Sequence, residues 1–165
     1  MCFTIPDYSF AQAKRTELEK LNTLAGDWVA QGGGQPGQGE GNFSFQFDLD
    51  KKVMVRKNTS EYPPVGNKPA IVHLDLMVIY SISTTDSLKA IYFDNEGHTI
   101  NYSIYFADEE KTIQFVSNTL QNIPVFRLTY SFTDKDNMTV NFEIAPPGGP
   151  GNFRSYVKGS AHRKK

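Results

Sequence analysis

Alternation of apolar and polar residues is the feature that most constrains the fold of this chain. Phe43, Phe45 and Phe47 alternate with Ser44 and Gln46, and the segments 126–132 and 138–144 follow the same rule. Successive side chains of a β-strand point to opposite faces, so a period of two indicates strands with one apolar face. The chain after residue 26 is therefore predicted to be mainly β-sheet.

Turn-forming residues divide this region into about ten strands. The expected runs are 26–29, 43–49, 53–60, 72–82, 88–93, 99–106, 112–117, 125–133, 138–145 and 153–161. No second helical segment is available to cross over between parallel strands, so the sheet should be antiparallel. Closure removes the unpaired edges of such a sheet, which predicts an all-β, up-and-down barrel. A two-sheet sandwich with a solid core is the alternative.

One helix is predicted before the sheet, at residues 10–24. Leu18, Leu21 and Leu24 fall on one side at spacings of three, Ser9 can cap the N-terminus and Gly26 can end the helix. The chain has 165 residues, which is within the range of one domain. We expect a single domain over 1–165, with the barrel at 26–161.

Charge and composition exclude several classes of protein. Seventeen Lys+Arg stand against 18 Asp+Glu, a formal net charge of -1, and the basic cluster at 162–165 is short, so no nucleic acid is expected as partner. No apolar run is long enough to span a bilayer, and the start lacks the pattern of a secretory signal. With Cys2 as the single cysteine, we expect a cytoplasmic protein without a membrane partner.

Catalytic motifs are lacking in the sequence. The glycine-rich stretch 32–41 precedes a strand, whereas a phosphate-binding loop needs a helix after it. No serine lies in a nucleophile elbow, and no paired carboxylates suit a hydrolase. Enzymatic activity is therefore left open, with a non-catalytic role favoured.

The segment LeuAlaGlyAspTrpVal at 24–29 resembles the calycin superfamily, in which lipocalins and fatty-acid-binding proteins open their barrels with Gly-x-Trp. Gly26 would let the chain turn sharply, and Trp28 would plug one end with a large ring. The resemblance implies that a basic residue of the last strand covers the indole, with Arg163 as first candidate and Arg154 as second. Longer segments at 53–63, 76–80, 90–98, 126–130 and 142–147 resemble an uncharacterised group of calycin-like bacterial proteins, whose fold is similar to nitrobindin-like haem-binding barrels.

Together the resemblance and the aromatic rows predict that the barrel binds a small apolar ligand. The expected ligand-binding residues are Trp28, Phe45, Arg56, Tyr92, Tyr102, Arg127 and Tyr130. A haem-binding barrel is the alternative; no other cofactor is expected, and His98 or His162 would be the axial ligand only if haem binds. An enzyme acting on a small substrate in the barrel is a further alternative.

Three other features have a simpler structural explanation. Arg127 and Glu143 are expected to form a cross-strand ion pair on the outer face. His73 and Asp75 share a strand face, but further ligands for a metal site are lacking. Strands 73–80 and 90–94 are partly apolar on both faces, which leaves a homodimer possible.

Overall fold

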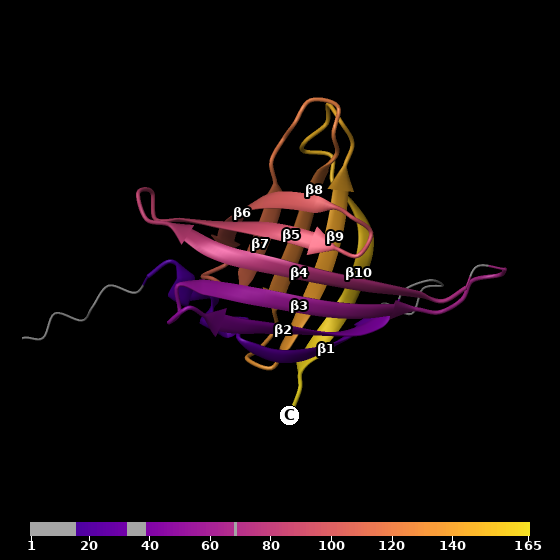
Figure 1. Ribbon diagram of the computed structural model, residues 1–165, viewed down its shortest axis with the longest axis horizontal. Coiled ribbons are helices and arrows are strands. Elements are labelled where there is room, and N and C mark those ends of the chain that lie inside the picture. The colour runs from indigo at the N-terminus through magenta and orange to yellow at the C-terminus, as the bar shows by residue number, and fades with distance from the viewer. Residues whose placement is uncertain (1–15, 33–38, 68) are drawn as a thin grey trace, which may run out of the picture.

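Ten antiparallel strands close into one barrel in the computed structural model, which describes residues 16–32, 39–67 and 69–165. Each strand pairs with its neighbours in sequence, and β1 pairs with β10 to close the ring (Figure 1). The strands are β1 (Gly26–Gly32), β2 (Glu40–Asp48), β3 (Val53–Tyr62), β4 (Ile71–Ile82), β5 (Ser87–Asp94), β6 (Thr99–Ala107), β7 (Thr112–Ser117), β8 (Val125–Phe132), β9 (Asn137–Ala145) and β10 (Arg154–Arg163). The predicted fold class is confirmed, and the sandwich is excluded.

The helix before the barrel differs from the prediction. The structure has a 3₁₀ helix, η1, at Leu18–Thr23, and the predicted segment 10–15 lies outside the described residues. Leu18 and Leu21 are buried in this helix, and Leu24 is buried directly after it. The predicted apolar spacing is thus used for packing, although over a shorter element. Within the part of the chain that is described, no helix is long and apolar enough to cross a membrane.

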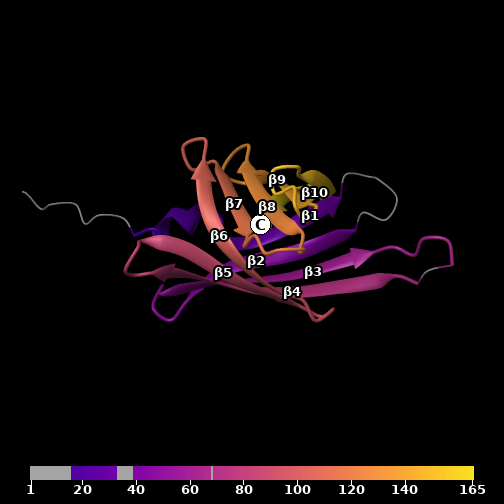
Figure 2. The same cartoon turned by 90° about the horizontal axis from the view of Figure 1, so that it is seen from above.

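The two ends of the barrel are built differently. Turns of only a few residues join β2 to β3, β4 to β5, β6 to β7 and β8 to β9 at the end where η1 lies. The longer connections 63–70, 118–124 and 146–153 lie at the other end, which we call the open end. Seen from above, β2–β5 form one wall and β7–β10 form the facing wall (Figure 2).

The end that carries η1 is closed by Trp28. This side chain is completely buried, and its indole Nε1 donates a hydrogen bond to the Leu24 carbonyl at 2.8 Å. The guanidinium of Arg163 lies 4.2 Å from the ring centroid and donates to the carbonyls of Ala25 and Thr23 at 2.5 and 3.1 Å. The expected cover of the indole by Arg163 is confirmed.

Gly26 has a φ of +123°, a region that side chains strongly disfavour. A Cβ at this position would lie 2.6 Å from Arg163 Nη1. The glycine is therefore needed twice, for the turn into β1 and for the close approach of the arginine.

Candidate functional site

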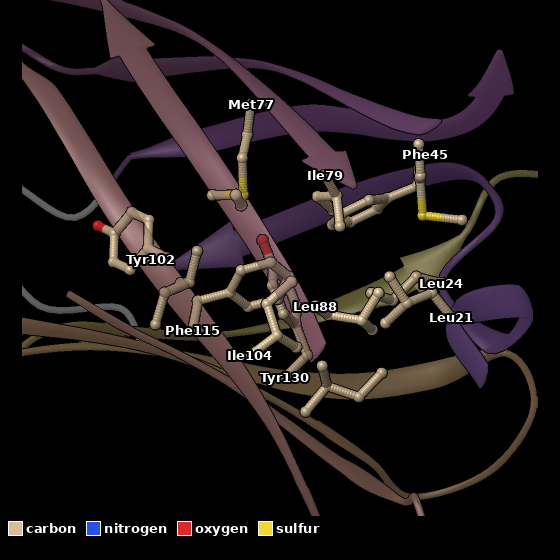
Figure 3. Packing of buried hydrophobic residues seen from close by; sticks show 14 of the residues in the cluster. Leu21, Leu24, Phe45, Met77, Ile79, Leu88, Tyr102, Ile104, Phe115 and Tyr130 are labelled. Atoms are coloured by element: carbon tan, nitrogen blue, oxygen red, sulfur yellow. The ribbon is translucent and has the colours of Figure 1, made fainter. Parts of the chain in front are cut away.

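The closed half of the barrel interior is a packed core. Aromatic rings fill it in edge-to-face contact. The ring centroids of Phe45 and Phe115 lie 5.5 and 5.9 Å from that of Tyr130. Leu21 and Leu24 of the η1 region pack against the same cluster (Figure 3). Side chains therefore occupy this half, and only the open half can accept a ligand.

In the open half, inward-facing side chains are partly exposed. The inward rows of β5, β8 and β9 contain Tyr92, Phe126 and Phe142, each half-buried, whereas Leu88 and Tyr130 deeper in the same rows are buried. Phe126 and Phe142 are stacked with their centroids 5.9 Å apart. An apolar wall on β8 and β9 thus faces the open end.

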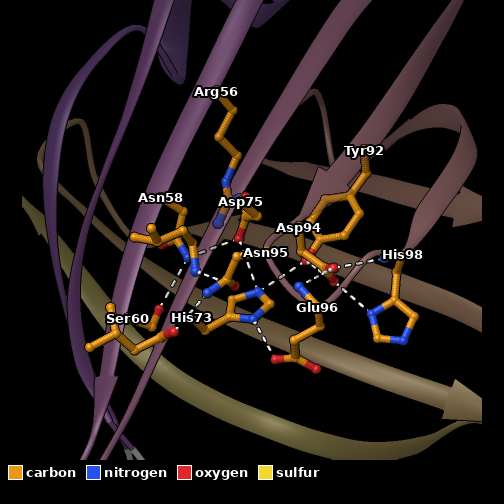
Figure 4. A network of polar contacts seen from close by, with 12 residues as sticks. Arg56, Asn58, Ser60, His73, Asp75, Tyr92, Asp94, Asn95, Glu96 and His98 are labelled. Carbon is orange, nitrogen blue, oxygen red and sulfur yellow. Dashed lines mark hydrogen bonds and ion pairs between the residues drawn. The ribbon is translucent and has the colours of Figure 1, made fainter.

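The wall on β3–β5 carries polar side chains in its inward rows. Arg56 on β3 forms an ion pair with Asp75 on β4, and both side chains are less than 10% exposed. Asp75 also accepts a hydrogen bond from Asn58 at 2.9 Å, and Asn58 donates to Ser60 at 3.1 Å. These residues and the histidine cluster described next form one network (Figure 4). We call it the polar wall.

His73 extends the polar wall toward the rim. Its Nδ1 lies 3.0 Å from Glu96 Oε1, and its Nε2 lies 3.0 Å from the Tyr92 hydroxyl and 3.5 Å from Asp75 Oδ2. Asp75 and then Glu96 raise the pKa of His73 to about 9, although partial burial opposes this. The imidazolium therefore donates to Glu96 and Tyr92 at neutral pH, and the Tyr92 hydroxyl donates to Asp94 at 3.3 Å.

Burial and the surrounding charges keep the central groups in one protonation state. Burial raises the pKa of Tyr92, Tyr102 and Tyr130, the last to about 12, so all three remain phenols at neutral pH. Burial opposes the charge of Arg56, but Tyr130, Asp75 and Tyr92 raise its pKa above the ordinary value. The wall is thus lined by fixed hydrogen-bond donors and acceptors.

Arg56 Nε of the polar wall and the hydroxyl of Tyr130 on β8 are both buried inside the barrel, and neither makes a well-formed hydrogen bond among the described residues. Each side chain is less than 10% exposed. The two side chains lie close enough to interact directly, through charge and hydrogen bonding. This contact offsets part of the cost of burying the two polar groups.

The structure places the predicted site residues in three regions. Arg56, Tyr92, Tyr102 and Tyr130 come together inside the barrel, where Tyr92 and Tyr102 meet edge-to-face at 6.3 Å. Trp28 and Phe45 belong to the packed closed half.

The third region is outside the barrel. Arg127 alternates with the inward Phe126 and Leu128, and therefore lies on the outer face. There it pairs with Glu143 at 2.7 Å and stacks on Phe153 at 3.9 Å. The predicted cross-strand ion pair of Arg127 and Glu143 on the outer face therefore agrees with the structure.

Neither predicted histidine lies in the interior. His98 is exposed at the rim and contacts Asp94 Oδ2 at 2.8 Å. His162 is exposed on β10, next to the inward Ala161. The histidine that does line the interior is His73, and both of its ring nitrogens are occupied by Glu96 and Tyr92. These positions do not fit an axial haem ligand in the barrel.

Sequence reasoning missed Asn58, His73, Asp75 and Asp94 as members of the polar wall. A signal was present. Each of these residues continues an inward row by a step of two, Asn58 after Arg56, and Asp75 and His73 before Met77. Polar residues that interrupt the inward-facing apolar rows of several neighbouring strands indicate a polar region inside the barrel. Only the pairing of the strands, however, shows that these polar side chains lie next to one another.

The outer face carries two shallow depressions. The larger, of about 390 Å³, lies across β3–β5 and includes the outward Lys57, Leu76 and Phe93. The smaller, of about 210 Å³, lies across β1–β3. Both are open to solvent, and we place the site instead inside the barrel, where the buried ion pair of Arg56 and Asp75 lies. No group of three potential metal ligands occurs within the described ranges.

Comparison with known proteins identifies the fold only. No family model matches the chain, and no curated protein matches it. Among solved structures, the crystal structure of Rv2717c from M. tuberculosis is similar, with a TM-score of 0.63 and 14% sequence identity over 92% of this chain and 99% of that chain. The chain is a closed ten-stranded antiparallel barrel, and its similarity to Rv2717c is a similarity of fold.

Proposed function

We propose that this barrel binds a small, mostly apolar ligand in its open half, without catalysing a reaction. The observation that carries the proposal is the contrast between the two halves: the closed half is fully packed, whereas inward-facing apolar side chains of the open half stay partly exposed. Exposed apolar surface inside a concavity is typical of ligand sites.

A non-catalytic role is supported by the state of the polar wall. Arg56 is neutralised by Asp75, and the Tyr92 phenol is held between His73 and Asp94. Burial raises the pKa of this phenol. A general base or nucleophile needs a pKa near the working pH, and this phenol is far from that range. The wall is suited to orienting a ligand.

Titration with the neutral dye Nile red, followed by its fluorescence, tests the proposal. Phe142→Ser, on the inner apolar wall, should weaken dye binding about tenfold, because burying a phenyl ring contributes about 1.5–3 kcal/mol. Phe93→Ser is the matched control, since Phe93 is 43% exposed on the outer face. Dye binding that is lost in Phe93→Ser and retained in Phe142→Ser would move the site to the outer depression and contradict the proposal.

A further inference from the structure

The two ends of the barrel differ in the charge of their loops. At the end that carries η1, three of the four turns contain charged runs, at 50–52, 108–111 and 134–136. At the open end, the long loops 63–70, 118–124 and 146–153 contain no Asp, Glu or Arg, and their one lysine is Lys68. The short turn 95–98 adds Glu96, which His73 holds. The long loops around the open end are therefore nearly free of charge.

Large apolar side chains of these loops are exposed to solvent. Val65, Leu120 and Ile123 are all exposed, Leu120 at 57%, and Tyr156 on β10 is exposed at the same end. Figure 1 shows loop 118–124 at the top and the loop between β3 and β4 at the far right, so the exposed residues flank the open end on two sides. Apolar side chains that gather on one exposed region mark a contact surface.

The composition of these loops suits a neutral lipid surface. A charged side chain is costly to bring to the boundary between headgroups and acyl chains, and loops without charge avoid this cost. Tyrosine is enriched at this boundary because its ring is amphipathic. Interfaces between proteins are instead enriched in arginine, which all three loops lack. Exposed charges begin directly behind the loops, at Glu61 and Arg154, so contact would be limited to the loop tips.

We propose that the open end of the barrel docks onto a neutral lipid surface through Val65, Leu120 and Ile123, with Tyr156 at the boundary. The barrel would lie on the bilayer without crossing it. The expectation of no membrane partner rests on the lack of a spanning run, which a surface contact does not need. Docking requires no bound ligand, but it would turn the open half of the interior toward the phase in which apolar compounds dissolve.

Flotation with phosphatidylcholine vesicles tests the docking. Leu120→Gln combined with Ile123→Gln removes the apolar side chains of one loop, and Val65→Gln does so independently in another. Leu49→Gln is the matched control, because Leu49 is 67% exposed in a charged turn at the opposite end. All four side chains are exposed, so the urea midpoints of the variants should equal that of the wild type.

We expect the wild-type protein to float equally well in about 0.1 M and about 1 M NaCl, since the contact is uncharged. The double variant should bind the vesicles about tenfold more weakly, because binding scales with the buried apolar area. Val65→Gln should also weaken binding, and Leu49→Gln should not. No flotation of the wild type, equal losses in Leu49→Gln, or binding to anionic vesicles alone that salt abolishes would each overturn the proposal. A dimer that the loop variants dissociate, without flotation, would overturn it in favour of contact between copies of the chain.

Discussion

Replacement of Arg56 by methionine should destabilise the protein, because it breaks a buried ion pair. The change leaves the Asp75 carboxylate, 4% exposed, without its cation. Removing one partner of a buried pair costs about 3–5 kcal/mol.

His73 Nε2 lies 3.5 Å from Asp75 Oδ2 and substitutes in part for the lost cation, so we expect a cost of about 3 kcal/mol at pH 7. Urea unfolding at pH 7 measures this free energy. In the Arg56→Met background, Asp75→Asn should recover most of the loss at pH 7, because it removes the uncompensated charge.

Arg127→Met is the matched control. Its partner Glu143 is also a cross-strand carboxylate, but the two side chains are 28% and 13% exposed. The control should cost about 1 kcal/mol or less at pH 7. Equal losses in Arg56→Met and Arg127→Met at pH 7 would refute the reasoning about the buried pair.

Three further predictions concern the remaining features. The folded-state pKa of His73 is raised to about 9 from 6.5, so the stabilising effect of its charge is complete below pH 6.5 and is lost as the pH rises to 9. The urea midpoint of the wild type should therefore fall between pH 6.5 and 9, whereas that of His73→Gln should stay level. Parallel pH profiles of the two proteins would contradict this prediction. Gly26→Ala should lower the free energy of unfolding by about 1–3 kcal/mol, because of its positive φ and the contact with Arg163; a neutral effect in thermal unfolding would show that the turn adapts. Arg163→Met should change the fluorescence of Trp28, the single tryptophan, and expose it to acrylamide, while Arg154→Met should not; unchanged quenching in both would contradict the role of the arginine as a cover.

The fold could be predicted from sequence because each of its determinants is local. The period-two rows between residues 43 and 144, the turns between them and the single leucine-spaced segment before Gly26 are all readable without contacts. The contact of Arg163 with Trp28 joins the two ends of the barrel sequence. This contact could be predicted only because residues 24–29 resemble the opening of calycin barrels, and that resemblance implies a basic residue of the last strand over the indole.

The site was harder to predict because it depends on the register of three strands. Arg56 and Asp75 are 19 positions apart in sequence. Arg56 pairs across the strands with Met77, and Asn58 pairs with Asp75, so the ion pair is diagonal. Arg127 is among the predicted ligand-binding residues, although its alternation with Phe126 and Leu128 places it on the opposite face. The depth of the packed core, which decides where a ligand can lie, depends on side-chain volumes across the whole ring.

Two expectations remain predictions. Leu74 and Phe93 are exposed on the outer face of β4 and β5, where a second copy of the chain could cover them. Sedimentation would measure the mass of the assembly in solution.

The small apolar ligand itself is the central claim. Native mass spectrometry of gently purified protein, with an absorbance scan of the same sample, tests that claim most directly. We predict a co-purifying mass of a small, mostly apolar compound and no Soret band. A bare chain mass that stays unchanged after incubation with a neutral lipid extract would contradict the account.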